Sequence, residues 1–253
     1  MSAISLQGKH ALITGGGRGI GLATAHALSR HGVRLTLLSR EISEDDVRAT
    51  GLRDFIALRC DVTDGVAVNN AFASARNLHG GVEILINNAG IAKSAPFART
   101  EPAMWDHILA VNLTGTYLCT KAAVNDMLAA GFGRIVNIAS TAGLCGAPYI
   151  SAYSASKHAV VGLTRSLAEE YQHHNVTVNA VCPGYTDTDM MAQAVGNIAE
   201  KTGLSQQQAR EQLAQSNVQG RLVQPQEVAE TVLALCEATS SGACVVLPGG
   251  EFR

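Results

Sequence analysis

The sequence predicts an α/β fold in which helices cover both faces of one parallel sheet. Short apolar runs alternate with longer segments of helical spacing, which is the pattern of repeated strand–helix units. Hydrophobic residues make up 47% of the chain and aromatic residues only 4%, so the core consists mainly of Ala, Val, Leu and Ile. Small apolar side chains of this kind suit helices packed closely on parallel strands. A glycine-rich turn also joins the first strand to the first helix.

The apolar pattern predicts each element in turn. Strands are expected at 10–14, 33–38, 55–60, 84–86, 134–138, 176–181 and 243–247. Helices are expected at 19–30, within 41–52, and at 66–78, 104–128, 152–171 and 224–237. No repeat, linker or low-complexity tract interrupts this order, so we expect one domain over residues 1–253. Between 185 and 220 no strand pattern is visible, and we expect a substrate lid containing helical pieces at 189–200 and 205–215.

Composition and charge exclude several classes of function. The net charge is -2 and no basic run is present, so we expect no nucleic-acid partner. No secretion signal opens the chain, and no apolar stretch approaches the roughly 20 residues that a membrane helix needs. The six cysteines are scattered singly, which favours free thiols in a reducing compartment. The free thiols lead us to expect a cytoplasmic protein. The eight histidines lack ligand spacing, so we expect no metal site.

The glycine-rich turn after the first strand is typical of a dinucleotide site. It reads Thr14-Gly15-Gly16-Gly17-Arg18-Gly19-Ile20-Gly21 and leads directly into the first helix. Glycines allow the backbone to bend sharply and allow a pyrophosphate to approach the amides. The helix N-terminus behind them favours negative charge. A purely structural turn would have similar glycines, but the strand before it and the helix after it favour dinucleotide binding.

The residues after the second strand indicate which dinucleotide is bound. A carboxylate about 20 residues past the glycines would bind the ribose hydroxyls of NAD, and none is present there. Arg40 instead offers a planar cationic fork suited to a 2′-phosphate, and Arg18 could join it. The alternative is that both are ordinary surface arginines, and Glu41 could neutralise Arg40 or bind the ribose itself. We therefore favour NADP(H) over NAD(H).

Polar residues follow the third and fourth strands. Asp61 could accept a hydrogen bond from an adenine amine or could cap the next helix. Asn87 and Asn88 could tie neighbouring strands together through their side chains. Ala89 and Gly90 then leave room for a cofactor ribose.

Tyr153 and Lys157 lie four residues apart on a predicted helix and therefore share a face. A nearby ammonium group favours phenolate and lowers the pKa of a tyrosine, so the pair could exchange protons. Taken alone, the two could equally be an exposed pair on an amphipathic helix. Ser140 follows the fifth strand, where doubly wound sheets bind ligands. Asn112 interrupts an apolar helix face, either as a polar anchor in the core or as a residue that holds a water molecule.

The chain contains, in order, Thr14-Gly15-x-x-x-Gly19-x-Gly21, Asn87-Asn88-Ala89-Gly90, Asn112, Ser140, Tyr153-x-x-x-Lys157 and Pro183-Gly184. Together these motifs resemble the short-chain dehydrogenase/reductase family over essentially the whole chain. The stretches 152–179 and 219–227 are most similar to its 3-oxoacyl (β-ketoacyl) reductases and polyketide ketoreductases. The resemblance implies a seven-stranded, Rossmann-type parallel sheet. Two departures are Leu247-Pro248-Gly249-Gly250, where the family often has Asp-Gly-Gly, and a short segment after Arg40.

The resemblance also implies roles for individual residues. Tyr153 would be the general acid in reduction and the general base in oxidation, and Lys157 would lower its pKa and hold the nicotinamide ribose. Ser140 would hydrogen-bond the substrate carbonyl, and Asn112 would position a water molecule that links Lys157 to solvent. The cofactor would contact Gly15, Gly17, Arg18, Gly19, Ile20, Gly21, Ser39, Arg40, Asp61, Val62, Asn88, Ala89, Gly90, Tyr153, Lys157, Pro183, Gly184, Thr186 and Thr188. The substrate would contact Ser140, Gly143, Leu144, Cys145, Tyr149, Tyr153, Tyr185 and Met190.

From these implications we expect an NADP(H)-dependent reductase of a 3-oxoacyl thioester or a related ketone. The alternatives are an NAD-dependent secondary-alcohol or 3-hydroxyacyl dehydrogenase that works in oxidation, and a dinucleotide-sensing protein. The intact catalytic set argues against a sensor, which needs no proton donor. The resemblance implies a homotetramer or a homodimer that forms through the helices at 104–128 and 152–171, and the Ala-rich faces of these helices fit close helix packing.

Overall fold

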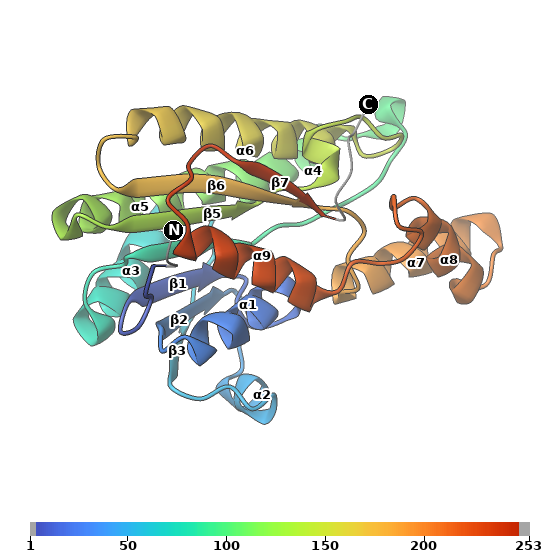
Figure 1. The fold of residues 1–253 in the computed structure, drawn as a ribbon. Helices are drawn as coiled ribbons and strands as arrows, with labels where there is room; N and C mark the ends of the chain where they lie inside the picture. Colours follow the sequence, from blue (N-terminus) through green and yellow to red (C-terminus); the bar gives the residue numbers. More distant parts are fainter. Residues whose placement is uncertain (1–3, 248–253) are drawn as a thin grey trace.

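Seven parallel strands form one sheet in the computed structural model, which describes residues 4–247 (Figure 1). The strands are β1 (His10–Thr14), β2 (Arg34–Ser39), β3 (Phe55–Arg59), β4 (Ile84–Asn87), β5 (Gly133–Ile138), β6 (Val176–Pro183) and β7 (Cys244–Leu247). They lie in the order β3-β2-β1-β4-β5-β6-β7, so the order reverses between β1 and β4. In sheets of this kind the carboxyl ends of the strands at the reversal are where ligands bind. The predicted fold class is confirmed.

Helices cover both faces of the sheet. On one face α1 (Gly19–Arg30) packs with α9 (Pro225–Glu237); the other carries α3 (Gly65–His79), α5 (Gly115–Ala130) and α6 (Ser151–Glu170) (Figure 1). Successive strand side chains point to opposite faces. Leu12 accordingly packs with α3 and α5, whereas Ile13 packs with α1 and α9. Because both faces are covered, the strands read as continuous apolar runs.

The helix predicted at 104–128 is confirmed as one continuous helical segment, although the segment is irregular. It consists of α4 (Pro102–Leu109), a π-helical turn (Ala110–Thr114) and α5. A π-helical turn contains one more residue than an α-helical turn and occurs often at functional sites. Asn112 lies in the middle of it, and its backbone oxygen accepts a 2.8 Å hydrogen bond from the Thr116 hydroxyl.

The segment predicted as a lid contains two helices, α7 (Asp189–Thr202) and α8 (Gln206–Gln215). Both extend away from the rest of the molecule (Figure 1). They are held by a small apolar cluster of their own, formed by Met191, Val195, Ala209, Leu213 and Leu222. Both helical pieces are confirmed, whereas the role of the segment as a lid stays a prediction.

The remaining elements are short, and some boundaries differ from those predicted. Between β2 and β3 lies α2 (Glu44–Ala49), and 3₁₀ turns occur at Phe97–Arg99 and Thr141–Gly143. Strand β6 continues past Val181 to Pro183, where a strand end tolerates the missing N–H group. No helix in the described part of the chain is long and apolar enough to cross a membrane. The departure at Pro248, Gly249 and Gly250 lies outside the described residues.

Candidate active site

The turn between β1 and α1 needs glycine at the predicted positions. Gly15 has a φ of +63°, and a Cβ atom there would lie 2.8 Å from Asn88 Nδ2. A Cβ at Gly21 would lie 2.3 Å from the Gly15 oxygen, so helix and turn could not approach as they do. Arg18 is the N-cap residue of α1, and no described side chain caps this helix. The first amides of α1 are therefore available to an anion, and the turn fits a pyrophosphate.

Asn88 fixes this turn to the end of β4. Its Nδ2 donates to the backbone oxygens of Thr14 (2.9 Å) and Gly15 (3.1 Å). In return, the Thr14 hydroxyl accepts hydrogen bonds from the backbone amides of Asn88 and Ala89, both at 2.9 Å. The prediction that this asparagine ties neighbouring strands is confirmed.

A chain of buried hydrogen bonds connects α5 to α6 along the face of the sheet that both helices cover. Asn87 Nδ2 donates to the hydroxyl of Thr120 (3.0 Å) and to Asn137 Oδ1 (2.9 Å). Asn137 Nδ2 donates to the hydroxyl of Thr164 on α6 (2.8 Å). Asn137 and Thr164 were not among the predicted site residues, although a polar residue inside the apolar fifth strand was a visible signal.

The residues predicted to choose the cofactor lie at the end of β2 and at the start of α1. Arg40 is exposed, and among the described residues no ion pair joins it to Glu41. Arg18 forms an exposed ion pair with Asp189, the first residue of α7, at 3.5 Å. Ser39 donates from its hydroxyl to the Glu41 backbone oxygen at 3.2 Å. Both arginines thus point to solvent, where a phosphate can reach them.

Asp61 has a local hydrogen-bonding role. Its Oδ1 accepts from the amide (2.9 Å) and the hydroxyl (2.8 Å) of Thr63. The bond from the Thr63 amide lowers the pKa of Asp61, and the charge of Arg40 acts in the same direction. Helix α3 is capped by Asp64, so the capping role left open for Asp61 is wrong. The side chain of Val62 is buried, and a Cβ on Gly115 would lie 2.7 Å from its Cγ2, so only its backbone can face a cofactor.

Tyr153 and Lys157 occupy successive turns of α6, as predicted. Lys157 is 4% exposed, and its Nζ donates to the Ile138 backbone oxygen at 2.7 Å. The same nitrogen lies 5.8 Å from the centroid of the Tyr153 ring. Burial lowers the pKa of Lys157 from 10.5 to about 8, because a cation with little solvent around it is costly.

The pKa of Tyr153 is set mainly by burial. Burial raises it above the ordinary value, since the phenolate would lose its solvation, and the effect of the Ser140 hydroxyl in the opposite direction is smaller. The expectation that Lys157 lowers this pKa stays a prediction, because burial sets the net direction here. Ser140 itself is 9% exposed, and its Oγ accepts from the Ala142 amide at 3.1 Å.

Asn112 is a buried anchor between the loop after β4 and helix α6. Its Oδ1 accepts from the Ile91 amide (2.8 Å), and its Nδ2 donates to the Ile91 oxygen (3.0 Å) and to Ser156 Oγ (3.0 Å). The Ser156 hydroxyl in turn donates to the Tyr153 backbone oxygen at 2.7 Å. The anchoring role is confirmed, whereas the water relay stays a prediction. Ser156 was missed, because a serine on a helix gives no signal by itself.

Gly90 lies between Asn112 and Lys157. A Cβ at Gly90 would lie 3.3 Å from Asn112 Oδ1 and 3.6 Å from Lys157 Nζ. Gly90 therefore lets the chain pass close to both side chains, and the predicted room for a cofactor ribose stays a prediction. A larger residue there would press on both side chains at once.

The predicted substrate residues divide into exposed and packed groups. Tyr149, Tyr185 and Met190 are exposed by 63%, 39% and 41%, as large apolar side chains at a binding mouth can be. Leu144 and Cys145 are partly buried. Gly143 is buried, and a Cβ there would lie 2.8 Å from the Lys157 backbone, so it packs against α6, and its contact with the substrate stays a prediction.

Tyr149 also has a left-handed backbone conformation, with a φ of +68°. This conformation is uncommon for residues other than glycine, asparagine and aspartate, and it concentrates at functional sites. The Tyr149 oxygen accepts a 2.8 Å hydrogen bond from the Ala95 amide, which joins the loop after β4 to the loop before α6.

The residues after β6 face the glycine turn from the side of α7. Thr188 caps α7, and its Cγ2 would lie 3.4 Å from a Cβ placed on Gly19, whose φ is +53°. Thr186 is buried and donates from its hydroxyl to the Gly184 oxygen at 3.0 Å. The predicted cofactor residues of the first and sixth strands are thus brought together across the edge of the sheet.

This fold and this site define a class of enzyme, the dinucleotide-dependent oxidoreductases that use a tyrosine–lysine pair. The sequence model of the short chain dehydrogenase family matches residues 9–199, and the protein belongs to this family, whose members are oxidoreductases that act on CH–OH and C=O groups.

Individual relatives are similar over nearly their whole length. A 3-oxoacyl-[acyl-carrier-protein] reductase of Aquifex aeolicus is 36% identical, with 98% of this chain and 99% of the relative covered. A 2-(S)-hydroxypropyl-CoM dehydrogenase of Xanthobacter autotrophicus is 40% identical, with 94% of each covered. A crystal structure of a variant of actinorhodin polyketide ketoreductase with NADPH superimposes with a TM-score of 0.89 at 34% identity, and 97% of each chain is covered.

Proposed function

We propose that the protein is an NADPH-dependent reductase of a 3-oxoacyl thioester or a related ketone. The observation that carries this proposal is the position of Tyr153 on α6 beside the buried Lys157, with Ser140 near the phenol after the end of β5. A phenol that keeps its proton at neutral pH is ready to act as a general acid, as reduction requires, whereas oxidation requires the phenolate. The 3-oxoacyl reductase and the polyketide ketoreductase among the relatives support this direction.

The chain has the parts that such a reduction needs. Bound NADPH supplies the hydride, which forms the new C–H bond at the carbonyl carbon. The amides of the turn at Gly15 and of α1 hold the pyrophosphate, and Arg40 with Arg18 holds the 2′-phosphate. As charge builds on the carbonyl oxygen, the Ser140 hydroxyl donates a hydrogen bond to it. The oxygen then takes the phenolic proton of Tyr153.

Lys157 and Asn112 complete this proposal. The Tyr153 phenolate left after proton transfer lies near the Lys157 ammonium, which stabilises it. A water molecule held by Asn112 would connect Lys157 to solvent and return the proton. The position of Gly90 fits this arrangement, because the glycine lets Asn112 and Lys157 approach the same point with no side chain between them.

An NAD-dependent dehydrogenase working in oxidation is the second candidate. The ion pair of Arg18 with Asp189 favours it, since this contact opposes binding of a 2′-phosphate at Arg18. The Xanthobacter dehydrogenase among the relatives also fits this reading. A clear preference for NAD over NADP would support this candidate against the first.

A panel of oxoacyl thioesters, simple ketones and sugars, assayed with NADPH and NADH, tests the proposal. We expect NADPH-dependent reduction of an oxoacyl thioester or ketone, and we expect Tyr153→Phe to lower kcat by about 10²–10⁴-fold. Tyr117→Phe, on the exposed side of α5, is the matched control and should retain activity. Near-normal turnover by Tyr153→Phe would overturn the mechanism. Dinucleotide binding without turnover of any substrate would favour a sensor.

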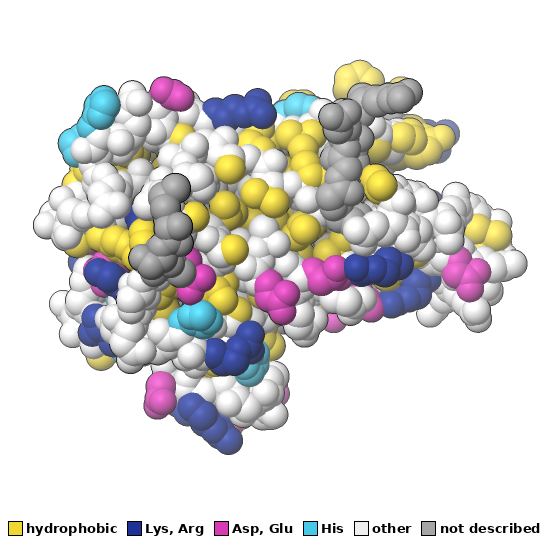
Figure 2. Space-filling view, in the orientation of Figure 1, with side chains coloured by type: hydrophobic (Ala, Val, Ile, Leu, Met, Phe, Trp, Pro, Cys, Tyr) yellow, Lys and Arg dark blue, Asp and Glu magenta, His cyan; other side chains and the backbone are white. Residues whose placement is uncertain are grey.

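We further propose one cytoplasmic catalytic domain that assembles as a homotetramer or homodimer through the helices at 104–128 and α6. Exposed Tyr117 and Leu128 on α5 support this surface. The six free cysteines fit a reducing compartment. Figure 2 shows further hydrophobic side chains gathered on the face that carries β7 and α9. Light scattering that found a monomer at working concentration would contradict the assembly.

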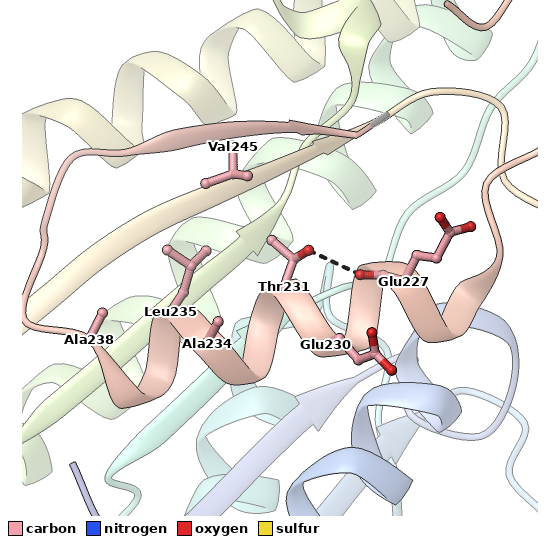
Figure 3. A pocket seen from close by; sticks show the side chains of 7 residues that line it. All are labelled: Glu227, Glu230, Thr231, Ala234, Leu235, Ala238 and Val245. Atoms are coloured by element: carbon pink, nitrogen blue, oxygen red, sulfur yellow. Dashed lines mark hydrogen bonds between the residues drawn. The ribbon is translucent and has the colours of Figure 1, made fainter. Parts of the chain in front are cut away.

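The face that carries β7 and α9 has a shallow hollow of about 610 Å³ (Figure 3). The residues that line it come from α9, from the position just after α9 and from β7: Glu227, Glu230, Thr231, Ala234, Leu235, Ala238 and Val245. None of them is a predicted site residue. We therefore assign the chemistry to the carboxyl edge of the sheet and not to this hollow.

A further inference from the structure

Asn217 is a buried amide at the base of the segment that contains α7 and α8. It lies between α8 and α9 in a stretch of mostly exposed residues, and yet it is only 7% exposed. An asparagine is seldom buried unless its polar atoms are paired. Nothing in the reaction proposed above uses this residue.

The contacts of Asn217 join the two ends of that segment. Its Oδ1 accepts from the Tyr185 amide at 2.9 Å, and its Nδ2 donates to the Tyr185 oxygen at 2.9 Å and to the Arg221 oxygen at 2.7 Å. The amide thus pairs with Tyr185 as a neighbouring strand would. A Cβ on Gly184 would lie 2.3 Å from Asn217 Oδ1, so only glycine permits this approach.

The residues around Asn217 are also anchored to the rest of the fold. The Val223 amide donates to the Tyr185 oxygen at 2.9 Å. The Arg221 side chain forms a bidentate ion pair with Glu227 of α9, with both distances at 2.7 Å. Asn217 and Arg221 therefore connect Tyr185 to helix α9.

Tyr185 is the functional end of this connection. It follows β6 directly, is 39% exposed, and lies at the carboxyl edge of the sheet, where the amide of Ala139, next to Ser140, donates to the Val181 oxygen of β6 at 2.8 Å. Its backbone N–H is paired with Asn217 Oδ1, and an unpaired amide at this place would allow the chain to move. Asn217 thus holds the backbone from which the Tyr185 side chain extends at the edge that carries Ser140.

We propose that Asn217 is a positioning residue that holds Tyr185 at the substrate side of Tyr153 and thereby sets the affinity for the carbonyl substrate. The inference rests on the proposed function in one respect, that the substrate binds beside Tyr153. Asn217 has no described contact with Tyr153, Lys157 or Ser140. Its loss reduces the population that can bind substrate, and it leaves the chemical step intact once substrate is bound.

Steady-state kinetics of Asn217→Ala tests the proposal. We expect KM for the ketone to rise about tenfold, from the loss of hydrogen bonds that are partly replaced by water. We expect kcat and the Kd for NADPH to stay close to those of the wild type. Asn197→Ala is the matched control, because Asn197 is exposed on α7 and makes no hydrogen bond within the described residues. An unchanged KM in Asn217→Ala would overturn the proposal.

A double-mutant cycle separates positioning from general destabilisation. Tyr185→Ala should also raise KM, and the double variant Tyr185→Ala/Asn217→Ala should match Tyr185→Ala alone, since Asn217 acts through Tyr185. Additive effects on KM would contradict this. If Asn217→Ala fails to fold, Asn217→Asp keeps the acceptor for the Tyr185 amide. Its KM should rise with pH as the carboxylate ionises against two backbone oxygens, and a KM independent of pH would count against the proposal.

Hydrogen exchange gives a readout that does not depend on activity. The Tyr185 amide should be protected in the wild type and should exchange faster in Asn217→Ala, with no change in Asn197→Ala. Equal exchange in all three proteins would overturn the positioning role even if the enzyme reduces ketones. If the wild type reduces no carbonyl compound, the proposed function fails, and the exchange result still decides whether Asn217 holds Tyr185.

Discussion

Replacing Lys157 with methionine is expected to abolish activity and to change how stability depends on pH. Lys157 is a buried cation, 4% exposed, and no carboxylate pairs with it among residues 4–247. Its pKa falls from 10.5 in the unfolded chain to about 8 in the folded protein. Folding with a charged Lys157 is therefore unfavourable relative to folding with a neutral one.

The size of this effect follows from the difference between 10.5 and about 8. At about 1.4 kcal/mol for each pKa unit, the penalty is about 3 kcal/mol below the folded pKa. The unfolded chain binds more protons between the two pKa values, so stability rises with pH in that window. From about pH 7 to about pH 9.5, this one group adds about 2 kcal/mol to the free energy of unfolding.

Urea unfolding of both proteins at several pH values measures this contribution. The stability of Lys157→Met relative to the wild type should fall by about 2 kcal/mol between about pH 7 and about pH 9.5. The lost hydrogen bond to Ile138 changes the difference at every pH but does not change its slope. Lys121→Met, at an exposed position of α5, is the control and should show no such slope. A difference between Lys157→Met and wild type that is independent of pH would refute the reasoning.

Three further predictions concern the cofactor end and the far end of β1. Arg40→Ala should raise the KM for NADPH by about 10- to 100-fold and leave the KM for NADH nearly unchanged, since a charged hydrogen bond contributes about 1.5–3 kcal/mol; equal effects on both cofactors would contradict this. Asp189→Asn releases Arg18 and should lower the Kd for NADPH, measured by calorimetry, by about two- to fivefold at low salt. High salt should remove this gain, because it screens the charges. Burial lowers the pKa of His10 below 6.5, so the free energy of unfolding should fall as pH drops below that value, and His10→Gln should remove this dependence in pH-resolved denaturation.

The strands and most helices could be predicted because burial leaves a direct trace in the sequence. Strands covered on both faces read as unbroken apolar runs, and glycine or proline marks many of their ends. The chain positions of Ser140, Tyr153 and Lys157 could be predicted for the same reason, because each lies at or near the end of a recognisable element. The close approach at Gly21 also follows from residue type alone.

Other features depend on contacts between distant segments and could not be read from the sequence. The π-helical turn keeps the apolar spacing of the helix nearly intact, so the pattern around Asn112 does not reveal it. The raised pKa of Tyr153 depends on how much protein surrounds the ring. Asn217 lies in a polar run, and its partner Tyr185 is 32 residues away, so only the folded chain shows that it is buried.

The π-helical turn at 110–114 places a constraint on the length of the chain as well as on its composition. Deleting one residue there would allow α4 and α5 to join as a regular α-helix, and α4 would then turn by about 100° and shift by about 1.5 Å relative to α5. Asn112 could no longer reach both Ile91 and Ser156. Single-residue deletions should therefore be tolerated in the connection between α7 and α8 and not in this turn, which makes residue count itself a determinant of the active site.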